Sequence, residues 1–117
     1  IATTHNDRGL AYAKLGQLDE AIADYEEAIR IDPQLAAAYN NLGFAYRDLG
    51  QLQLAIDNLD QAISLDREFQ LAYYNRALVN ILLGRDLAAE EDGQRAVELG
   101  FDPGLLTVAI ATLKDSR

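Results

Sequence analysis

Apolar residues recur along most of this chain at three- and four-residue steps. In the stretch 18–31, Leu18, Ala21, Ile22, Tyr25 and Ala28 fall on one face of a helix, a spacing that differs from the strict alternation of a strand. The same spacing predicts seven helices, over 2–15, 18–31, 35–49, 52–65, 69–83, 86–99 and 104–114. The predicted fold class is therefore all-α.

Glycine, proline and small polar residues mark the predicted helix ends. Glycines that can adopt the left-handed conformation follow three of the helices: Gly16, Gly50 and Gly84. Asp32-Pro33 is expected to end the second helix, because the residue before a proline disfavours the α conformation. Three residues are candidates to cap the first helix: Thr3, Thr4 and Asn6.

The whole pattern returns every 34 residues. Gly9, Gly43 and Ala77 align at this step. Further aligned sets are Tyr12, Tyr46 and Asn80; Gly16, Gly50 and Gly84; Ala21, Ala55 and Ala89; and Ala28, Ala62 and Ala96. Small residues kept in step like this indicate pairs of helices that approach closely in each unit, so the chain is expected to be a repeat protein.

These aligned residues resemble the pattern of the tetratricopeptide repeat (TPR) family. The middle unit carries the pattern as Tyr39, Leu42, Gly43, Tyr46, Ala55, Leu59 and Ala62. The resemblance covers about residues 2–101 and implies a right-handed α-solenoid of antiparallel helix pairs. We expect a single domain over 1–117, with units at about 2–35, 36–69 and 70–101 and a capping helix at about 104–114.

The third unit departs from the pattern. Asn80 and Gly93 stand where large residues are expected, and Phe101 is the nearest candidate to fill the resulting gap. We therefore expect the third unit to be the least stable. The linker Gly100-Phe101-Asp102-Pro103 is expected to be two residues longer than its counterpart at Ile31–Pro33.

The last predicted helix is apolar nearly all round. Leu106, Ile110 and Leu113 are placed to cover the preceding helix pair, since the end of a stacked array needs a cap. The other side carries Leu105, Val108 and Ala109. This second apolar side suggests a homo-oligomer formed through helix 105–113.

Composition and charge narrow the classes of partner. The net charge is −9, which argues against binding to nucleic acid or to anionic membranes. No apolar run approaches the ~20 residues that a membrane-spanning helix needs. The chain begins at Ile1 and contains no Met, so we expect a fragment or a processed form. No secretory signal is visible, but in a fragment this absence does not fix the compartment, and a cytoplasmic location is the favoured expectation.

The acidic residues gather on two of the predicted helices. They are Asp19, Glu20, Asp24, Glu26 and Glu27 in the first unit and Asp86, Glu90, Glu91, Asp92 and Glu98 in the third. We interpret them as a solvated outer face, and the alternative is a docking patch for a basic partner.

Motifs for catalysis or cofactor binding are absent. The only histidine, His5, occupies the position of Tyr39 and Tyr73 and is expected to be a packing residue. No phosphate-binding loop, zinc-type histidine pair or calcium loop occurs, and no cysteine is present. We predict a protein that is not an enzyme and has no metal or cofactor.

The family resemblance implies a concave groove lined by the first helix of each unit. The candidate groove residues are Asn6, Leu10, Asn40, Asn41, Phe44, Arg47, Tyr74, Asn75 and Leu78. The amides offer hydrogen bonds to the backbone of a peptide, and the apolar residues offer a place to bury its side chains. The predicted function is binding a peptide or helix of another protein, and the alternative for the asparagines is simple solvation. A structural self-assembly module and the TPR arm of a larger enzyme are the competing functions.

One use of the family groove is argued against. Some members grip a chaperone's C-terminal carboxylate with a Lys and an Asn from the first unit, an Asn from the second, and a Lys and an Arg from the third. The matching positions here are Asn6, Leu10, Asn41, Leu71 and Asn75, of which only Asn41 agrees. Without the cations, recognition of two carboxylates loses its strongest contacts.

Overall fold

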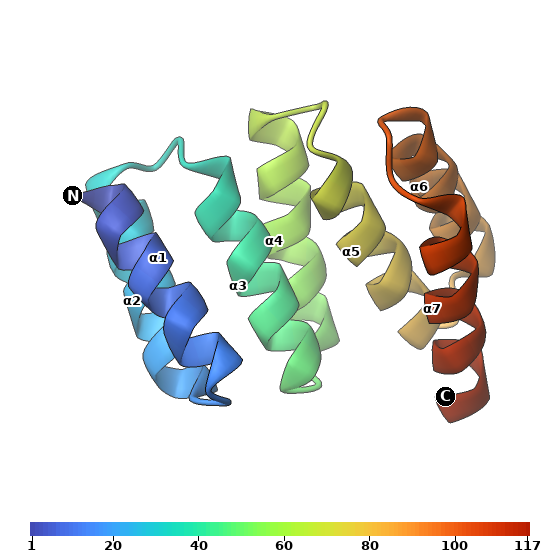
Figure 1. The fold of residues 1–117 in the computed structure, drawn as a ribbon, viewed down its shortest axis with the longest axis horizontal. Helices are drawn as coiled ribbons and strands as arrows, with labels where there is room; N and C mark the ends of the chain where they lie inside the picture. Colours follow the sequence, from blue (N-terminus) through green and yellow to red (C-terminus); the bar gives the residue numbers. More distant parts are fainter.

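A computed structural model describes all 117 residues and contains seven α-helices and no strand (Figure 1). The helices are α1 Ala2–Lys14, α2 Leu18–Ile31, α3 Ala36–Asp48, α4 Leu52–Leu65, α5 Gln70–Leu82, α6 Asp86–Glu98 and α7 Pro103–Ser116. Each helix begins and ends within two residues of its predicted bounds. The all-α prediction is confirmed.

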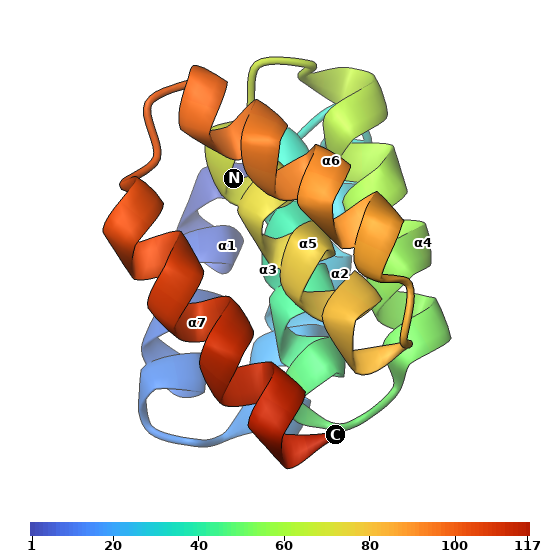
Figure 2. The same ribbon diagram turned by 90° about the vertical axis from the view of Figure 1, so that its right-hand side faces the viewer.

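The helices form two layers. Helices α1 and α2, α3 and α4, and α5 and α6 pack as antiparallel pairs, and successive pairs stack side by side (Figures 1 and 2). Helices α1, α3 and α5 make one layer, and α2, α4 and α6 make the other. The aligned alanines lie at the helix crossings with no exposed surface: Ala21, Ala28, Ala55, Ala62, Ala89 and Ala96. Their period is therefore the period of close helix contacts.

A second set of small residues faces large ones inside each pair. A Cβ added to Gly9 would lie 2.5 Å from Cε1 of Tyr25, and one added to Gly43 would lie 2.5 Å from Cγ of Leu59. In the third unit the equivalent of Tyr25 and Leu59 is Gly93. The atom nearest to a Cβ added there is Cδ2 of Leu106, at 3.0 Å. Leu106 of α7 therefore fills the gap, and the expectation that Phe101 would do so is wrong.

Two kinds of turn connect the helices. Within each unit a glycine with positive φ, at 76–77°, closes the first helix, as predicted for Gly16, Gly50 and Gly84. Between units, α2 and α4 end on extended aspartates, Asp32 and Asp66. The first helix has Ile1 as its N-cap and no side-chain cap. The expected capping residues Thr3, Thr4 and Asn6 instead lie inside α1.

The connection from α6 to α7 uses the within-unit type of turn. Gly100 has a φ of 108°, and the N–H of Phe101 donates to the carbonyl of Ala96 at 2.9 Å. After α1, the N–H of Gln17 donates to the carbonyl of Tyr12 in the same way, so both turns are closed by a hydrogen bond between residues five positions apart. The linker 99–102 has the same length as 32–35 and 66–69, so the expected two-residue extension is not present.

This turn directs α7 across α5. The structure brings the backbone of α7 close to α5 along its length (Figure 2). Asp102 caps α7 by accepting from the N–H of Gly104 at 2.8 Å. Leu105 and Val108 are 61% and 65% exposed on the outer side, where the sequence places a second apolar stripe. No helix combines the length and the apolar character needed to cross a membrane.

Candidate peptide-binding groove

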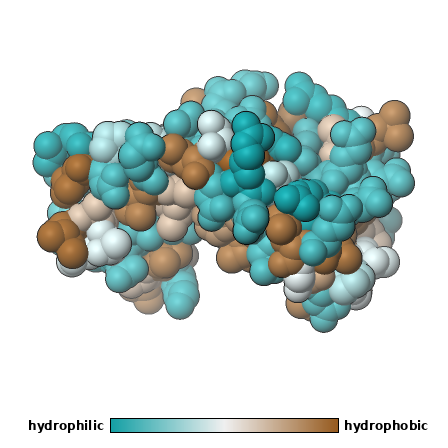
Figure 3. All heavy atoms as spheres, turned by 90° about the horizontal axis from the view of Figure 1, so that it is seen from above, coloured by the Kyte–Doolittle hydropathy of each residue, from teal (hydrophilic) through white to brown (hydrophobic).

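A cavity of about 390 Å³ lies between α1, α3 and α5, with one residue of α2 reaching it from behind. Its lining residues are Leu10, Ala13, Lys14, Tyr25, Asn40, Asn41, Phe44, Ala45, Leu71, Tyr74 and Asn75. We call this cavity the groove. Seen from above, the outline of the molecule is indented between its two ends, and hydrophobic residues gather around the indentation (Figure 3).

The structure brings most of the predicted site residues together. Six of the nine line the groove: Leu10, Asn40, Asn41, Phe44, Tyr74 and Asn75. Asn6 lies behind Asn41, the guanidinium of Arg47 lies 4.5 Å from the ring centroid of Phe44, and Leu78 is only 3% exposed. These three predicted residues are not among the residues that line the cavity.

The asparagines pair with one another across unit boundaries. Nδ2 of Asn41 donates to Oδ1 of Asn6 at 2.9 Å, and Nδ2 of Asn75 donates to Oδ1 of Asn40 at 2.9 Å. Each pair links the first helices of consecutive units. Each amide uses one of its two polar atoms in this pairing. No buried side-chain nitrogen or oxygen lacks a partner, so the other polar atoms remain in contact with solvent.

The apolar part of the wall is open. Leu10, Phe44 and Leu71 are 38%, 40% and 46% exposed, whereas the aligned third-unit residue, Leu78, is buried. Next to Leu78 in the fold, the ring of Phe101 stacks on the ring of Tyr74 with 4.2 Å between centroids. The linker before α7 therefore packs against one of the third-unit lining residues, Tyr74, while Leu71 of the same unit stays exposed.

Tyr25 is a lining residue that the sequence did not indicate. Its ring is 1% exposed, and burial raises the pKa of its hydroxyl to about 12. The sequence pattern places Tyr25 in the core, and the ring does pack against Gly9. Four further lining residues are outside the nine predicted ones: Ala13, Lys14, Ala45 and Leu71. Each lies three or four positions from a predicted residue on the same helix, so widening each predicted row by one turn would have included them.

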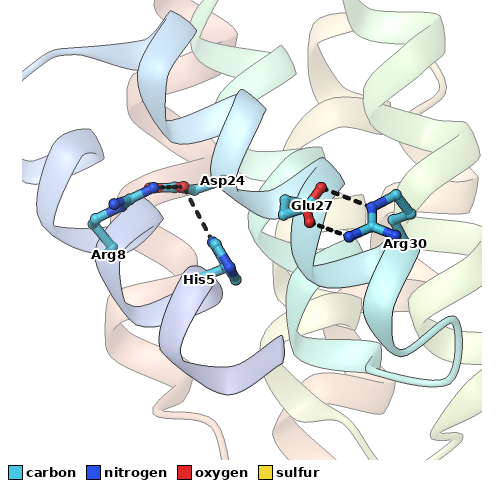
Figure 4. A network of polar contacts seen from close by, with 5 residues as sticks. All are labelled: His5, Arg8, Asp24, Glu27 and Arg30. Atoms are coloured by element: carbon cyan, nitrogen blue, oxygen red, sulfur yellow. Dashed lines mark hydrogen bonds and ion pairs between the residues drawn. The ribbon is translucent and has the colours of Figure 1, made fainter. Parts of the chain in front are cut away.

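A network of ion pairs outside the groove lining changes the interpretation of the acidic clusters. Arg8 donates from Nε and Nη2 to the two carboxylate oxygens of Asp24, and Nδ1 of His5 lies 3.6 Å from the same group (Figure 4). Arg30 pairs with Glu27 beside it (Figure 4). Because Asp24 is only 5% exposed, the predicted solvated face does not include it.

The third unit repeats this arrangement. Arg76 donates from Nε and Nη2 to Asp92 at 2.9 and 2.7 Å, and Asn80 adds a bond of 3.0 Å to the same carboxylate. Asp92 is 6% exposed. Asp86 pairs with Arg117 beyond α7. Three of the ten acidic residues thus hold the fold together, while Asp19, Glu20, Glu26, Glu90 and Glu91 are exposed.

Comparison with protein families decides the class. A model described as TPR repeat matches residues 9–47, and a model described as tetratricopeptide repeat matches residues 36–69. The chain belongs to the tetratricopeptide repeat family. Its seven helices fit three TPR units followed by a C-terminal helix.

Solved TPR domains have the same fold. The first TPR domain of Spaghetti (RPAP3), in a structure described as bound to the HSP90 peptide SRMEEVD, is 26% identical with a TM-score of 0.89 and coverage of 98% of this chain and 91% of that one. The Arabidopsis OM64 TPR domain is 26% identical, with a TM-score of 0.88 and coverage of 99% and 96%. MamA is 27% identical, with a TM-score of 0.83 and coverage of 98% and 67%.

A search of curated proteins gave no significant match. The family and the fold nevertheless agree on the general role of this chain. It is a helical-repeat module for protein–protein interaction, and the family models indicate no catalytic activity.

Proposed function

We propose that this TPR domain is a non-catalytic module that holds a peptide or helix of another protein in its groove. The observation that carries the proposal is the composition of the groove wall, in which exposed apolar side chains lie beside amides with a free polar atom. Apolar contacts with Leu10, Phe44 and Leu71 would supply binding energy. The free ends of the amides would hydrogen-bond to the backbone of the ligand and fix its register.

The amide pairs also set the orientation of the groove's polar atoms. Because Asn41 is held by Asn6 and Asn75 is held by Asn40, their free oxygens are fixed before a ligand arrives. A preorganised acceptor loses less conformational entropy on binding than a free side chain does.

The related RPAP3 domains bind an acidic HSP90 peptide, but this chain differs at the residues that would grip such a tail. Leu71 and Asn75 line the groove where the third-unit cations of the carboxylate clamp are expected. Asn6 replaces the first-unit lysine and is 7% exposed. We therefore propose a groove ligand with an apolar anchor and not a tail held through two carboxylates.

Two truncations to alanine at similarly exposed apolar positions test the proposal. Phe44→Ala removes a groove side chain that is 40% exposed, and Leu54→Ala removes an outer-face side chain that is 43% exposed. Immobilised wild-type and variant domains are used to capture partners from a lysate of the source organism, with circular dichroism to check folding. Loss of the captured protein with Phe44→Ala but not with Leu54→Ala supports the groove. Equal capture by both variants overturns it.

The double variant Asn41→Ala with Asn75→Ala is a second test, in which the expected loss of stability must be separated from the loss of binding. Removing these amides leaves Asn6 and Asn40 without their partners, so the domain should lose about 1–2 kcal/mol of stability. Capture should therefore be measured well below the melting temperature. Undiminished capture by the folded double variant would exclude the amides as ligand contacts.

Self-assembly through α7 is the second candidate, favoured by the exposure of Leu105 and Val108 at consecutive helical steps. Light scattering over a concentration series is the direct test, with Leu105→Ser and Val108→Ser as the variants. A wild-type chain that associates and a variant that does not would support it. A wild-type chain that stays monomeric at millimolar concentration would exclude it.

A further inference from the structure

The groove differs in charge from the rest of the molecule. The chain has 19 acidic residues and a net charge of −9, yet no aspartate or glutamate is among the residues that line the groove. Lys14 is the single charged residue of that lining. It takes part in none of the ion pairs of the structure, whereas Arg8, Arg30, Arg76, Arg95, Lys114 and Arg117 all do.

A second cation reinforces this end of the groove. The guanidinium of Arg47 lies over the ring of Phe44, which lines the groove, and only 17% of the Arg47 side chain is exposed. Asp48 pairs with Arg47 at 3.4 Å and partly offsets its charge, and neither of these two residues lines the groove. Lys14 and Arg47 both lie in the last turn of their helices, α1 and α3, so the two cations belong to the same end of the first layer.

The nearest acidic residue on α1, Asp7, lies outside the groove lining and away from Lys14. Asp7 is exposed on α1 and lies seven residues before Lys14, about 10 Å along the helix axis. At the aligned positions the second and third units carry the neutral Asn41 and Asn75. A negative group on a bound peptide would therefore be attracted to Lys14, at the end of α1, with no carboxylate in the groove lining to oppose it.

We infer that the groove selects a peptide in which a carboxylate flanks an apolar residue, and that Lys14 receives this carboxylate. This inference rests on the proposed function and names the chemistry of its ligand. The apolar residue would occupy the space between Leu10 and Phe44, next to Lys14 on the same wall. The single carboxylate would bind at the C-terminal end of α1. It would not bind at Asn6, Leu71 and Asn75, the neutral residues at the positions of the carboxylate clamp's cations.

Another role for Lys14 makes a different prediction. A lysine in the last turn of a helix also offsets the negative end of the helix dipole, and that role requires no ligand. In that case Lys14→Gln would lower stability slightly and leave ligand choice unchanged. Ligand selectivity is therefore the readout that separates the two roles.

The experiment uses three short blocked peptides that share two leucines and carry Asp, Asn or Lys at one flanking position. Each is titrated into the ¹⁵N-labelled chain, with the shifts of groove amides as the signal. The wild type should bind the Asp peptide about two- to five-fold more tightly than the Lys peptide at low salt, the range expected for one exposed ion pair. The difference should shrink as salt is added.

Lys14→Gln and Arg67→Gln change the net charge by the same amount, so comparing these two variants assigns the effect to a residue. Lys14→Gln should abolish the preference, and Lys14→Glu should reverse it toward the Lys peptide. Arg67→Gln removes an unpaired cation in the α4–α5 linker, outside the groove, and should keep the wild-type preference. A preference that survives in Lys14→Gln, or that Arg67→Gln removes equally, overturns the inference. If none of the peptides shifts groove amides at millimolar concentration, the proposed function fails instead.

Discussion

Arg8 and Asp24 form a bidentate ion pair between the helices of the first unit. Nε and Nη2 of Arg8 lie 2.8 and 2.7 Å from the two carboxylate oxygens of Asp24. The pair joins residues sixteen positions apart and is repeated at the same separation by Arg76 and Asp92 in the third unit. The middle unit has Leu42 at the aligned position and packs it into the core. The outer units therefore use charge where the middle unit uses an apolar contact.

The two pairs should differ in their contribution to stability. Asp24→Ala removes the partner of Arg8, whose side chain is 60% exposed and can be solvated, so we expect a loss of about 1 kcal/mol. Asp92→Ala leaves the more buried Arg76 and Asn80 unpaired, and we expect about 2–3 kcal/mol.

Urea unfolding followed by circular dichroism measures both losses. Asp60→Ala is the control, because Asp60 contacts the same Arg76 at 3.1 Å but is 55% exposed, and its loss should be within about 0.5 kcal/mol of zero. Equal losses for Asp24→Ala and Asp92→Ala would show that burial of the partner does not decide the effect.

Acid should weaken the first unit through the same pair. The hydrogen bonds from Arg8 lower the pKa of Asp24 below its usual value of 3.8. The folded state therefore binds this proton less readily than the unfolded state. The stabilisation is complete above about pH 4 and is lost as the pH falls through the lowered pKa of the folded state.

Asp24→Asn makes this prediction measurable. The variant lacks the stabilisation at neutral pH and has nothing to lose at that site in acid. Its melting temperature should fall less between pH 7 and pH 2.5 than that of the wild type. Parallel curves for the two proteins would indicate that acid acts through other carboxylates, among them Asp86, whose pKa is lowered by Arg117.

Two helix glycines should respond oppositely to alanine. In Gly43→Ala the new methyl group would lie 2.5 Å from Cγ of the fully buried Leu59, so we expect a loss of about 1–3 kcal/mol. In Gly93→Ala it would meet only the tip of Leu106 at 3.0 Å, while α6 gains about 0.5–1 kcal/mol of helix propensity.

Thermal melts of the two variants check this comparison. Gly43→Ala should melt at a temperature several degrees below that of the wild type, and Gly93→Ala should melt at or above it. A drop as large for Gly93→Ala as for Gly43→Ala would show that Leu106 cannot move aside and that α7 is held firmly on α6.

The repeat period accounts for what could be predicted from the sequence. Aligned alanines mark the helix crossings, and aligned glycines with positive φ mark the within-unit turns, so helix bounds and pairing follow from local patterns. Most of the groove follows as well, because residues at one phase of α1, α3 and α5 share a face. The buried Asp24 was missed because polarity alone places an acid on the surface. The alignment of Arg8 with Arg76 and of Asp24 with Asp92 is the signal that would have found it.

The path of α7 was harder to predict. The dipeptide Leu99-Gly100 has the same residue types as Leu15-Gly16, which closes a first helix, and both form the same turn. Where the following helix then lies depends on tertiary packing, chiefly on Leu106 against Gly93 and on Phe101 against Tyr74. Neither contact has a counterpart in the preceding units, so the period carries no information about it.

Hydrogen exchange should place the weakest point of the fold in α7. The sequence suggests that the third unit opens first because of Asn80 and Gly93, but the Asn80 amide donates to Asp92 and Leu106 covers Gly93. Helix α7 contains no buried residue, whereas α5 contributes Val79 and Ile81 to the core with at most 2% exposed. Helices that bury few apolar groups open at a low free-energy cost.

We therefore expect the amides of α7 to exchange first and those of α5 to exchange with global unfolding. Leu106→Ala should speed exchange in α7 and also around Gly93 in α6, because the side chain joins the two helices. Leu105→Ala, a truncation of the same size on the exposed side, should leave α6 unchanged. Protection of α7 equal to that of α5 would mean that its outer apolar face is covered in solution, which would favour association through Leu105 and Val108.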